Sequence, residues 1–265
     1  MTNANGFRLF LCVIFVCLIG SGCTSDEPAK KHTEVTKNVE PKDKLPSKGK
    51  EEMPDEGGDQ SNMMVIEEAP KDSKSPAEAA TYQYKLIMAN GEENFMTQSA
   101  VVNEVVLGDR GLVLLDTRKF NDNFILMVYE KSDRWETSSV LEIDYQNGEQ
   151  YEEAKELSLP FDSFVVVNQP KSNPAIWTFS NGKEVVTIAE YKDYEFDKGK
   201  NISMETSPGG KQLFVSKEPD NHYLYYGGSG YTVVISGTIK IDEMKQLADS
   251  MDSVQLPNFP VVSNL

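Results

Sequence analysis

The sequence predicts an α+β protein: an antiparallel sheet with a packed C-terminal helix, preceded by a disordered tether. Short apolar runs of strand length alternate with turn dipeptides from residue 82 onward. No series of strand–helix–strand units occurs there, which argues against a parallel, doubly wound sheet. A segment near the C-terminus repeats apolar residues at intervals of three and four, as one face of a helix does.

Residues 1–22 have the organisation of a cleaved export signal. Arg8 places a positive charge before an apolar core at residues 9–19, which is shorter than the about 20 residues that a membrane span needs. Small residues then lead to Cys23. The segment resembles a bacterial lipoprotein signal peptide, although Gly20 stands where that pattern prefers an aliphatic residue. The alternative interpretations are an ordinary secretory signal and an uncleaved short anchor.

The resemblance implies cleavage before Cys23 and lipidation of its thiol with a diacylglycerol. The acyl chains (palmitate, for example) would hold the protein at the extracytoplasmic face of the cell membrane. Each buried methylene contributes about 0.8 kcal/mol, so two acyl chains give a stable anchor. Cys12 and Cys17 leave with the signal, so the mature chain has one cysteine, which the lipid occupies. We therefore expect no disulfide, no cysteine nucleophile and no cysteine-based metal site.

Residues 23–81 are predicted to form a lipid-anchored, disordered linker. Residues 24–81 contain no Phe, Trp or Tyr and are rich in Lys, Glu, Asp, Pro, Ser and Gly. Such a composition does not bury enough apolar surface to offset the entropy of ordering the chain. A flexible chain of this length reaches on the order of 40 Å, which lifts a domain off the membrane. For the apolar run Met63–Ile66, the alternative interpretation is a linear motif that binds a partner.

Residues 82–156 are predicted to form a β-rich N-terminal subdomain, either separate or part of the same sheet as the residues that follow. Asn-Gly turn dipeptides at 90–91 and 147–148 punctuate it. A short acidic helix is expected at 149–157. The expected strands are 84–88, 112–115, 124–129 and, with a looser alternation, 135–145.

Residues 157–256 are predicted to form an antiparallel sheet closed by a helix, and residues 257–265, which contain two prolines, an extended tail. The helical stripe should lie on the sheet, so Leu247→Asp is expected to detach the helix. Lys245→Asp, on the opposite face, is expected to be nearly neutral. The stripe consists of Ile241, Met244, Leu247, Ala248 and Met251. The expected strands are 164–167, 176–179, 185–188, 213–215, 223–226 and 231–235.

The end of the chain carries a series of short motifs: Tyr-Tyr-Gly-Gly at 225–228, Ser-Gly at 236–237, Ile239, Asp-Glu-Met at 242–244 and Leu-Ala-Asp-Ser-Met at 247–251. This series resembles the ending of an uncharacterised bacterial envelope domain, which occurs in lipoproteins and in extracytoplasmic parts of anti-sigma-factor-like proteins. The resemblance covers about residues 157–252. It implies a fold similar to that of the lipoprotein-sorting carriers, a curved antiparallel sheet with helices on its concave side. It transfers no catalytic residue.

Few residues point to catalysis or metal binding. His32 lies in the tether, and His222 is the candidate base of a Ser-His-Asp hydrolase, but no Gly-x-Ser-x-Gly elbow supplies a serine. Structural zinc lacks its usual ligands, and no calcium-loop pattern occurs. Gly227–Gly230 lacks the lysine and helix of a phosphate-binding loop, so a turn between strands is expected. We therefore expect no catalytic residues, no cofactor and no metal.

Acidic residues dominate the charge, with 42 Asp and Glu against 26 Lys and Arg, and a net charge of −16. Nucleic-acid binding needs a basic face, so this balance argues against it. Hydrolysis by two carboxylates alone, as in glycosidases, remains open.

The sequence therefore predicts a non-catalytic bacterial cell-envelope lipoprotein whose globular part binds a protein, a lipid or a wall component near the membrane. One alternative is a carboxylate-based hydrolase acting on cell wall or glycan. Another is an envelope sensor or regulatory lipoprotein that signals through a partner. An apolar groove between sheet and helix would favour the binding function, and two paired acids in one cleft would favour the hydrolase.

Overall fold

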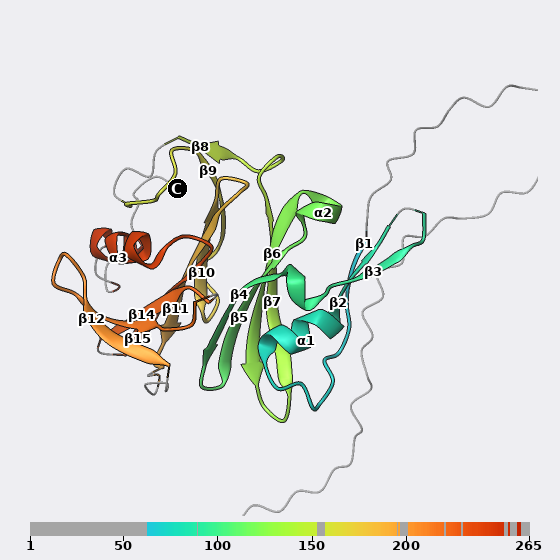
Figure 1. Ribbon diagram of the computed structural model, residues 1–265, viewed down its shortest axis with the longest axis horizontal. Helices are drawn as coiled ribbons and strands as arrows, with labels where there is room; N and C mark the ends of the chain where they lie inside the picture. The colour runs from blue at the N-terminus through green and yellow to red at the C-terminus, as the bar shows by residue number, and fades with distance from the viewer. Residues whose placement is uncertain are drawn as a thin grey trace, which may run out of the picture. The chain divides into compact units, whose positions relative to one another are not determined.

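The computed structural model describes residues 63–88, 90–152, 157–194, 196, 201–219, 221–228, 230–251, 254 and 259–260 (Figure 1). The predicted signal peptide, Cys23 and the linker up to residue 62 lie outside these residues, as does most of the predicted tail. Within the described part of the chain, no helix is both long and apolar enough to cross a membrane.

The strands of the described residues form three antiparallel sheets. The small sheet has the order β1-β2-β3 and contains β1 (Met63–Ile66), β2 (Tyr84–Ile87) and β3 (Glu93–Phe95). The four-stranded sheet has the order β4-β5-β6-β7 and contains β4 (Val101–Leu107), β5 (Arg110–Asp116), β6 (Asn123–Lys131) and β7 (Trp135–Asp144).

The largest sheet has eight strands in the order β12-β13-β14-β15-β11-β10-β9-β8. Its strands are β8 (Gln150–Tyr151), β9 (Phe164–Gln169), β10 (Ala175–Ser180), β11 (Val185–Lys192), β12 (Ile202–Thr206), β13 (Gln212–Ser216), β14 (Tyr223–Gly228) and β15 (Tyr231–Gly237). The helices are α1 (Pro76–Gln83), the short 3-10 helix η1 (Gln98–Ala100), α2 (Arg118–Asn121) and α3 (Ile241–Ser250).

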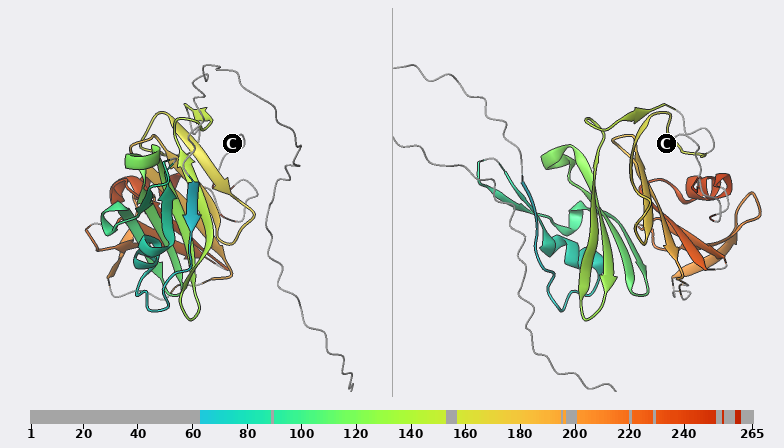
Figure 2. Two further views of the ribbon diagram at one scale, coloured as in Figure 1. Left: turned by 90° about the vertical axis from the view of Figure 1, so that its right-hand side faces the viewer. Right: turned by 180° about the vertical axis from the view of Figure 1, so that it is seen from behind.

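Successive residues of a strand point to opposite sides of the sheet. In both larger sheets, each of the two sides contributes to a buried core. The four-stranded sheet packs one face on the eight-stranded sheet, where Leu126 and Val234 belong to one core. Its other face packs on α1 and the small sheet, through residues such as Ile125 and Ala80. The far face of the eight-stranded sheet packs on α3, where Leu247 is fully buried. Figure 2 shows this order of layers.

The predicted antiparallel sheet with a C-terminal helix is confirmed, but the structure is richer in strand than an α+β class implies. Helices are few and short, and about half of the described residues lie in strands. The elements β2, β5, β6, β7, β9, β10, β11, β13, β14 and β15 all fall on predicted strands. Turn signals therefore located most strands. The four-stranded sheet and the small sheet add layers to the predicted sheet and helix.

The linker prediction is wrong for residues 63–81, which form β1 and most of α1. Ser75 caps α1, since its side chain accepts a hydrogen bond of 3.2 Å from the Glu78 amide. Three alanines, the last of them Ala80, fill the contact with the four-stranded sheet at no more than 1% exposure. Small side chains let a helix approach a sheet closely, so burial here needs no aromatic residue. Met63–Ile66 pairs with β2 instead of standing free as a linear motif.

The predicted division at residue 156 is also corrected. The acidic helix expected at 149–157 is absent from its described residues, because Gln150–Tyr151 forms β8 and pairs with β9. The Tyr151 ring stacks on Phe164 at 6.1 Å between centroids, which draws this segment into the eight-stranded sheet. Residues 82–156 therefore contribute one strand to that sheet and share a core with it, so they are not a separate subdomain.

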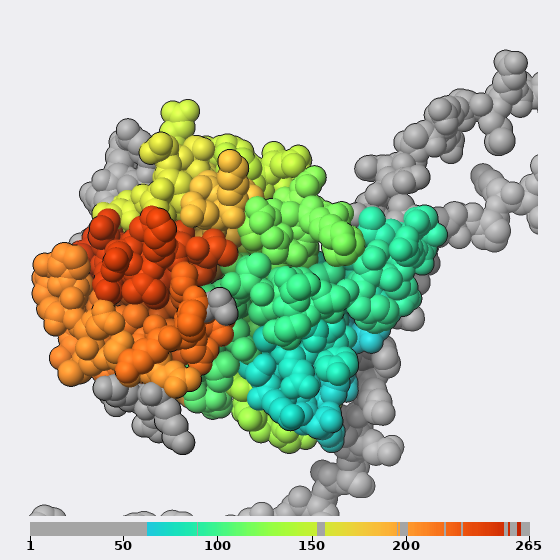
Figure 3. All heavy atoms as spheres, viewed as in Figure 1, coloured from blue at the N-terminus to red at the C-terminus, as the bar shows by residue number. Residues whose placement is uncertain are grey.

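The terminal helix forms where its apolar stripe predicts. Met244, Leu247 and Ala248 are fully buried against the eight-stranded sheet. Glu243 accepts a hydrogen bond of 2.8 Å from the Lys240 amide, which closes the first turn. At the other end, the Lys211 ammonium donates to the Ala248 carbonyl, where a cation suits the helix dipole. Figure 3 shows the atoms of α3 (red) lying directly against those of the neighbouring strands (orange).

The sequence predicted Lys245 on a solvent-facing side of α3, and this prediction is wrong. Its ammonium lies 2.9 Å from Glu205 and 3.1 Å from Asp242, and its side chain is 17% exposed. Lys245→Asp should therefore place three acids together, and we expect it to lower the free energy of unfolding by about 1 kcal/mol. Urea denaturation beside Lys245→Ala tests this. If the aspartate variant is no less stable than the alanine variant, the repulsion is absent.

Candidate binding site

A cavity of about 310 Å3 lies where β13, β14 and β15 run side by side. Four aromatic side chains contribute to its wall, and none of its described lining residues is charged. The lining residues are Phe196, Phe214, Tyr225, Gly227, Gly228, Tyr231 and Thr232. We refer to this space as the aromatic cavity.

Strand register brings the aromatic rings together. Phe214 of β13 pairs with Tyr225 of β14, so both side chains project from the same face of the sheet. Their rings stack with centroids 5.0 Å apart and an interplanar angle of 14°. Phe196 also contacts Tyr225, with ring centroids 6.1 Å apart and an interplanar angle of 74°. Two other rings therefore restrict the position of the Tyr225 ring before any ligand arrives.

Glycines shape the neighbouring end of β14. Gly228 pairs with Tyr231 across the strands, and a Cβ on Gly228 would lie 2.6 Å from the Tyr231 hydroxyl oxygen. A side chain at this position would therefore displace the tyrosine from the cavity wall. Gly230 follows with φ at +81°, a conformation that glycine adopts without strain. The prediction that Gly227–Gly230 joins two strands is confirmed by the described residues.

The hydroxyl of Tyr225, a residue of this wall, is buried. The residue is 3% exposed, and its hydroxyl oxygen is buried without a hydrogen-bond partner among the residues that the structure describes. Burial raises the pKa of Tyr225, so the group is a neutral proton donor at physiological pH. The nearby Thr232 hydroxyl already donates to the Tyr194 carbonyl at 2.7 Å. The aromatic cavity thus presents ring surface, while the Tyr225 hydroxyl is not exposed to it.

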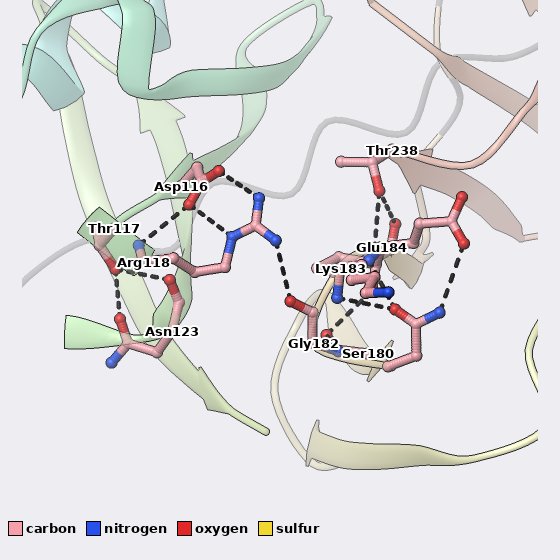
Figure 4. Close-up of polar contacts among 11 residues, drawn as sticks. Asp116, Thr117, Arg118, Asn123, Ser180, Gly182, Lys183, Glu184 and Thr238 are labelled. Atoms are coloured by element: carbon pink, nitrogen blue, oxygen red, sulfur yellow. Dashed lines mark hydrogen bonds and ion pairs between the residues drawn. The ribbon is translucent and has the colours of Figure 1, made fainter. Parts of the chain in front are cut away.

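A second cavity, of about 520 Å3, lies beside α2 and includes Arg118 in its wall. The Arg118 guanidinium donates to both carboxylate oxygens of Asp116, at 2.9 and 2.6 Å, and to the Gly182 carbonyl at 3.0 Å. These hydrogen bonds lower the pKa of Asp116. Figure 4 shows Arg118 reaching from the end of the four-stranded sheet to the β10–β11 turn. Arg118 therefore joins the four-stranded sheet to the β10–β11 turn, and three of the five N–H donors of its guanidinium serve these internal acceptors.

His222, the base considered from the sequence, lies just before β14. Its Nδ1 is 3.1 Å from the Ile239 carbonyl oxygen, and its own carbonyl accepts a hydrogen bond of 3.0 Å from the Asn103 amide. Within the described part of the chain, no Ser, Thr or Cys side chain makes a hydrogen bond to the ring. The arrangement ties the segment before β14 to the end of β15 and to β4.

Among the contacts of the described residues, no two acidic side chains pair without a cation beside them. Burial raises the pKa of Glu190, as a general acid would require, but the charge that acts on it is that of Lys192 and not a second carboxylate. Four cations each lie between two acids: Lys85 between Glu67 and Glu93, Arg110 between Asp109 and Glu130, Arg134 between Glu68 and Glu136, and Lys245 between Glu205 and Asp242.

The sequence did not point to the aromatic cavity. Phe214 and Tyr225 were predicted only as members of the strands 213–215 and 223–226, the glycines after Tyr225 as a turn, and Phe196 was assigned to no element. Alternation in β13 and β14 was the available signal, since it puts Phe214 and Tyr225 on one face once the strands are paired. Among the described residues, no group of three or more His, Cys, Asp or Glu side chains is placed to hold a metal ion.

An apolar groove between sheet and helix would have favoured the binding function, but the described residues of α3 and the eight-stranded sheet form a packed core there. The aromatic cavity is lined by Tyr225, which faces the four-stranded layer, and by Tyr231, which packs against the α3 side. No protein-family model, curated protein or solved structure matches the chain, so its relation to the envelope family remains a prediction.

Proposed function

We propose that the protein is a lipid-anchored, extracytoplasmic envelope lipoprotein whose folded part binds a ligand in the aromatic cavity and catalyses no reaction. In this proposal the lipid anchor is attached at Cys23, and the folded part is related to the carrier-like envelope domain. The observation that carries the proposal is the aromatic cavity itself, a space of about 310 Å3 whose wall includes four aromatic side chains. Ligand sites are typically concave and lined mainly by apolar and aromatic residues.

Binding fits the chemistry of the cavity better than hydrolysis does. Glycoside hydrolysis by carboxylates needs two acids on either side of the scissile bond. The described lining contributes aromatic rings, glycines and a hydroxyl, and the close acid pairs of the described residues enclose cations. No observation on the described residues favours the hydrolase or the sensor alternative, so neither is carried further.

Cys23→Ser should release the protein from the membrane or leave an uncleaved precursor. The hydroxyl of serine does not replace the thiol that the lipid-transfer reaction uses, so neither acylation nor the subsequent cleavage should occur. Metabolic labelling with a radioactive fatty acid, followed by membrane fractionation, measures both effects. Unchanged labelling and membrane retention in the variant would remove the anchor from the proposal.

Ligand binding is tested with envelope material divided into lipid, protein and polysaccharide fractions. Full-length Cys23→Ser protein is mixed with each fraction, and its melting temperature is recorded. We expect one fraction to raise the melting temperature, and Phe214→Leu, which removes a ring from the cavity wall, to reduce that rise. Phe95→Leu is the matched control, because Phe95 is an exposed residue of β3 that is not among the lining residues. If no fraction stabilises the protein, the binding function is wrong.

A further inference from the structure

We infer that the open edge of β1 is a docking site for an extended, basic segment of a partner protein, which joins the small sheet as a further strand. The site belongs to the small sheet, whereas the aromatic cavity belongs to the eight-stranded sheet. The inference follows from the hydrogen-bonding pattern of β1, from the side chains along its edge and from the charge of the groove beside it.

Backbone groups of β1 face outward at this edge. The Glu67 amide donates to the Gln83 carbonyl at 2.9 Å, so the backbone of Glu67 faces β2. Tyr84, which lies opposite Ile66, instead accepts a hydrogen bond of 3.4 Å from a backbone amide just after β3. Successive residues of a strand turn their backbone groups to opposite edges, so those of Met64 and Ile66 point away from β2. Among the described strands, β1 pairs with β2 alone, which leaves these donors and acceptors for an added strand.

A groove of about 250 Å3 lies beside this edge, between the end of β1 and the start of β7. Ile66 lines the groove from β1, and Trp135 and Thr137 line it from β7. Met64 and Ile66 project from the same side of β1, and both are exposed. Exposed apolar side chains on an open edge strand are typical of a surface that another strand covers.

The charge of the groove favours a basic partner. Its described lining residues include three acids, Glu67, Glu68 and Glu136, but one cation, Arg134. Arg134 lies 3.1 Å from Glu68 and 3.5 Å from Glu136, so these two acids share a single positive charge. Their side chains are 82% and 54% exposed, and a carboxylate accepts several hydrogen bonds, so each can bind a second cation. The net charge of −16 also attracts a basic segment to the chain.

Two other occupants fit this edge less well. A second copy of the chain would bring the same acids face to face, and like charges oppose such a contact. Residues 30–50 of this chain are rich in lysine, but Pro41 and Pro46 lack the N–H groups that a strand donates to its neighbour. The open edge and the acidic groove together therefore favour a basic strand from another protein.

Binding of a defined peptide tests the inference. Full-length Cys23→Ser protein is titrated with the fluorescently labelled peptide Lys-Val-Lys-Val-Lys-Val-Lys, and the anisotropy of the label gives the Kd. We expect Glu68→Gln combined with Glu136→Gln to raise the Kd about 5-fold, the effect of two surface ion pairs. Glu92→Gln combined with Glu152→Gln removes the same charge from exposed acids outside the groove and should alter the Kd less than about 2-fold.

Backbone methylation separates strand addition from a general attraction between charges. Two analogues of the peptide carry N-methyl groups on either the lysines or the valines. Alternate residues of an added strand donate to the edge, so one analogue should lose binding and the other should keep it. Equal binding of the two analogues, or equal Kd values for the two double variants, would overturn the inference.

The free protein identifies the other two occupants. Carbodiimide crosslinks from lysines of residues 30–50 to Glu68 or Glu136 would assign the groove to the protein's own chain. A dimer that Ile66→Lys dissociates would assign the edge to a second copy. Either result would overturn the assignment to a partner protein. None of these variants changes a lining residue of the aromatic cavity, so the proposed binding function stands or falls separately.

Discussion

Leu247→Asp is expected to lower the free energy of unfolding by about 4 kcal/mol or more. Leu247 is fully buried between α3 and the eight-stranded sheet. Truncating a buried leucine costs about 3–5 kcal/mol, and an unpartnered carboxylate in the same place adds a further penalty. Single domains are stable by only about 5–15 kcal/mol, so the variant should be close to unfolding at 25 °C. Urea denaturation followed by circular dichroism measures the loss.

Gln246→Asp is the matched control for this experiment. Gln246 is the preceding residue of α3 and is exposed, so the same aspartate enters water there. We expect its free energy of unfolding to stay within about 0.5 kcal/mol of the original. Equal denaturation midpoints for the two variants would show that α3 is not docked on the sheet.

Gly237→Ala is expected to cost about 3 kcal/mol or more. Gly237 ends β15 with φ at +143°, and a Cβ there would lie 2.1 Å from the Val185 carbonyl oxygen. That oxygen accepts a hydrogen bond of 2.9 Å from the Thr238 amide, and the Val185 amide donates to the Thr238 hydroxyl at 2.9 Å. A methyl group would therefore push apart strands that are held by these bonds, in addition to the strain of the backbone angle.

Gly91→Ala separates the two causes. Gly91 has φ at +82°, but a Cβ there would meet nothing within 4 Å. We expect a cost of about 1 kcal/mol from the backbone angle alone. Thermal melts of both variants give the comparison. If Gly237→Ala is no worse than Gly91→Ala, the close approach to Val185 does not limit stability.

Most strands could be predicted because turn signals and apolar runs are local. Asn181-Gly182 and the glycines before Tyr231 separate β10 from β11 and β14 from β15, and the structure has turns at both places. β12 (Ile202–Thr206) was missed, because Ile202 is its only buried residue and the others are partly or fully exposed. Its place is fixed by pairing with β13, which a local pattern does not reveal.

Residues 63–81 show why composition failed at the edge of the folded region. The segment has no aromatic residue, as disordered chains often lack them, yet its alanines and Tyr84 just beyond it complete a core with Ile125 and Met127. The partner surface lies on the four-stranded sheet, which begins at Val101. A segment that gains its burial from distant strands carries little local sign of being folded.

The aromatic cavity could not be predicted from the sequence, because its position depends on how the strands pair in three dimensions. Tyr225 and Tyr226 are adjacent and chemically identical, and both have buried hydroxyls without described partners. They differ in which side of the sheet they face, since Tyr226 packs in the core beneath α3 while Tyr225 faces the four-stranded layer and lines the cavity. Sequence alternation says that neighbours face opposite ways, but it does not say which side has the opening.

The central strands of the eight-stranded sheet also bear on how the protein unfolds. Ile235 belongs to the core under α3 and its neighbour Val234 to the core shared with the four-stranded sheet, so one strand supports both. Unfolding of either core disrupts β15, and the other core then loses the side chains that β15 contributes to it. The two halves are therefore expected to unfold in one cooperative transition, and a destabilising lesion under α3 should expose the four-stranded layer to proteolysis at the same denaturant concentration.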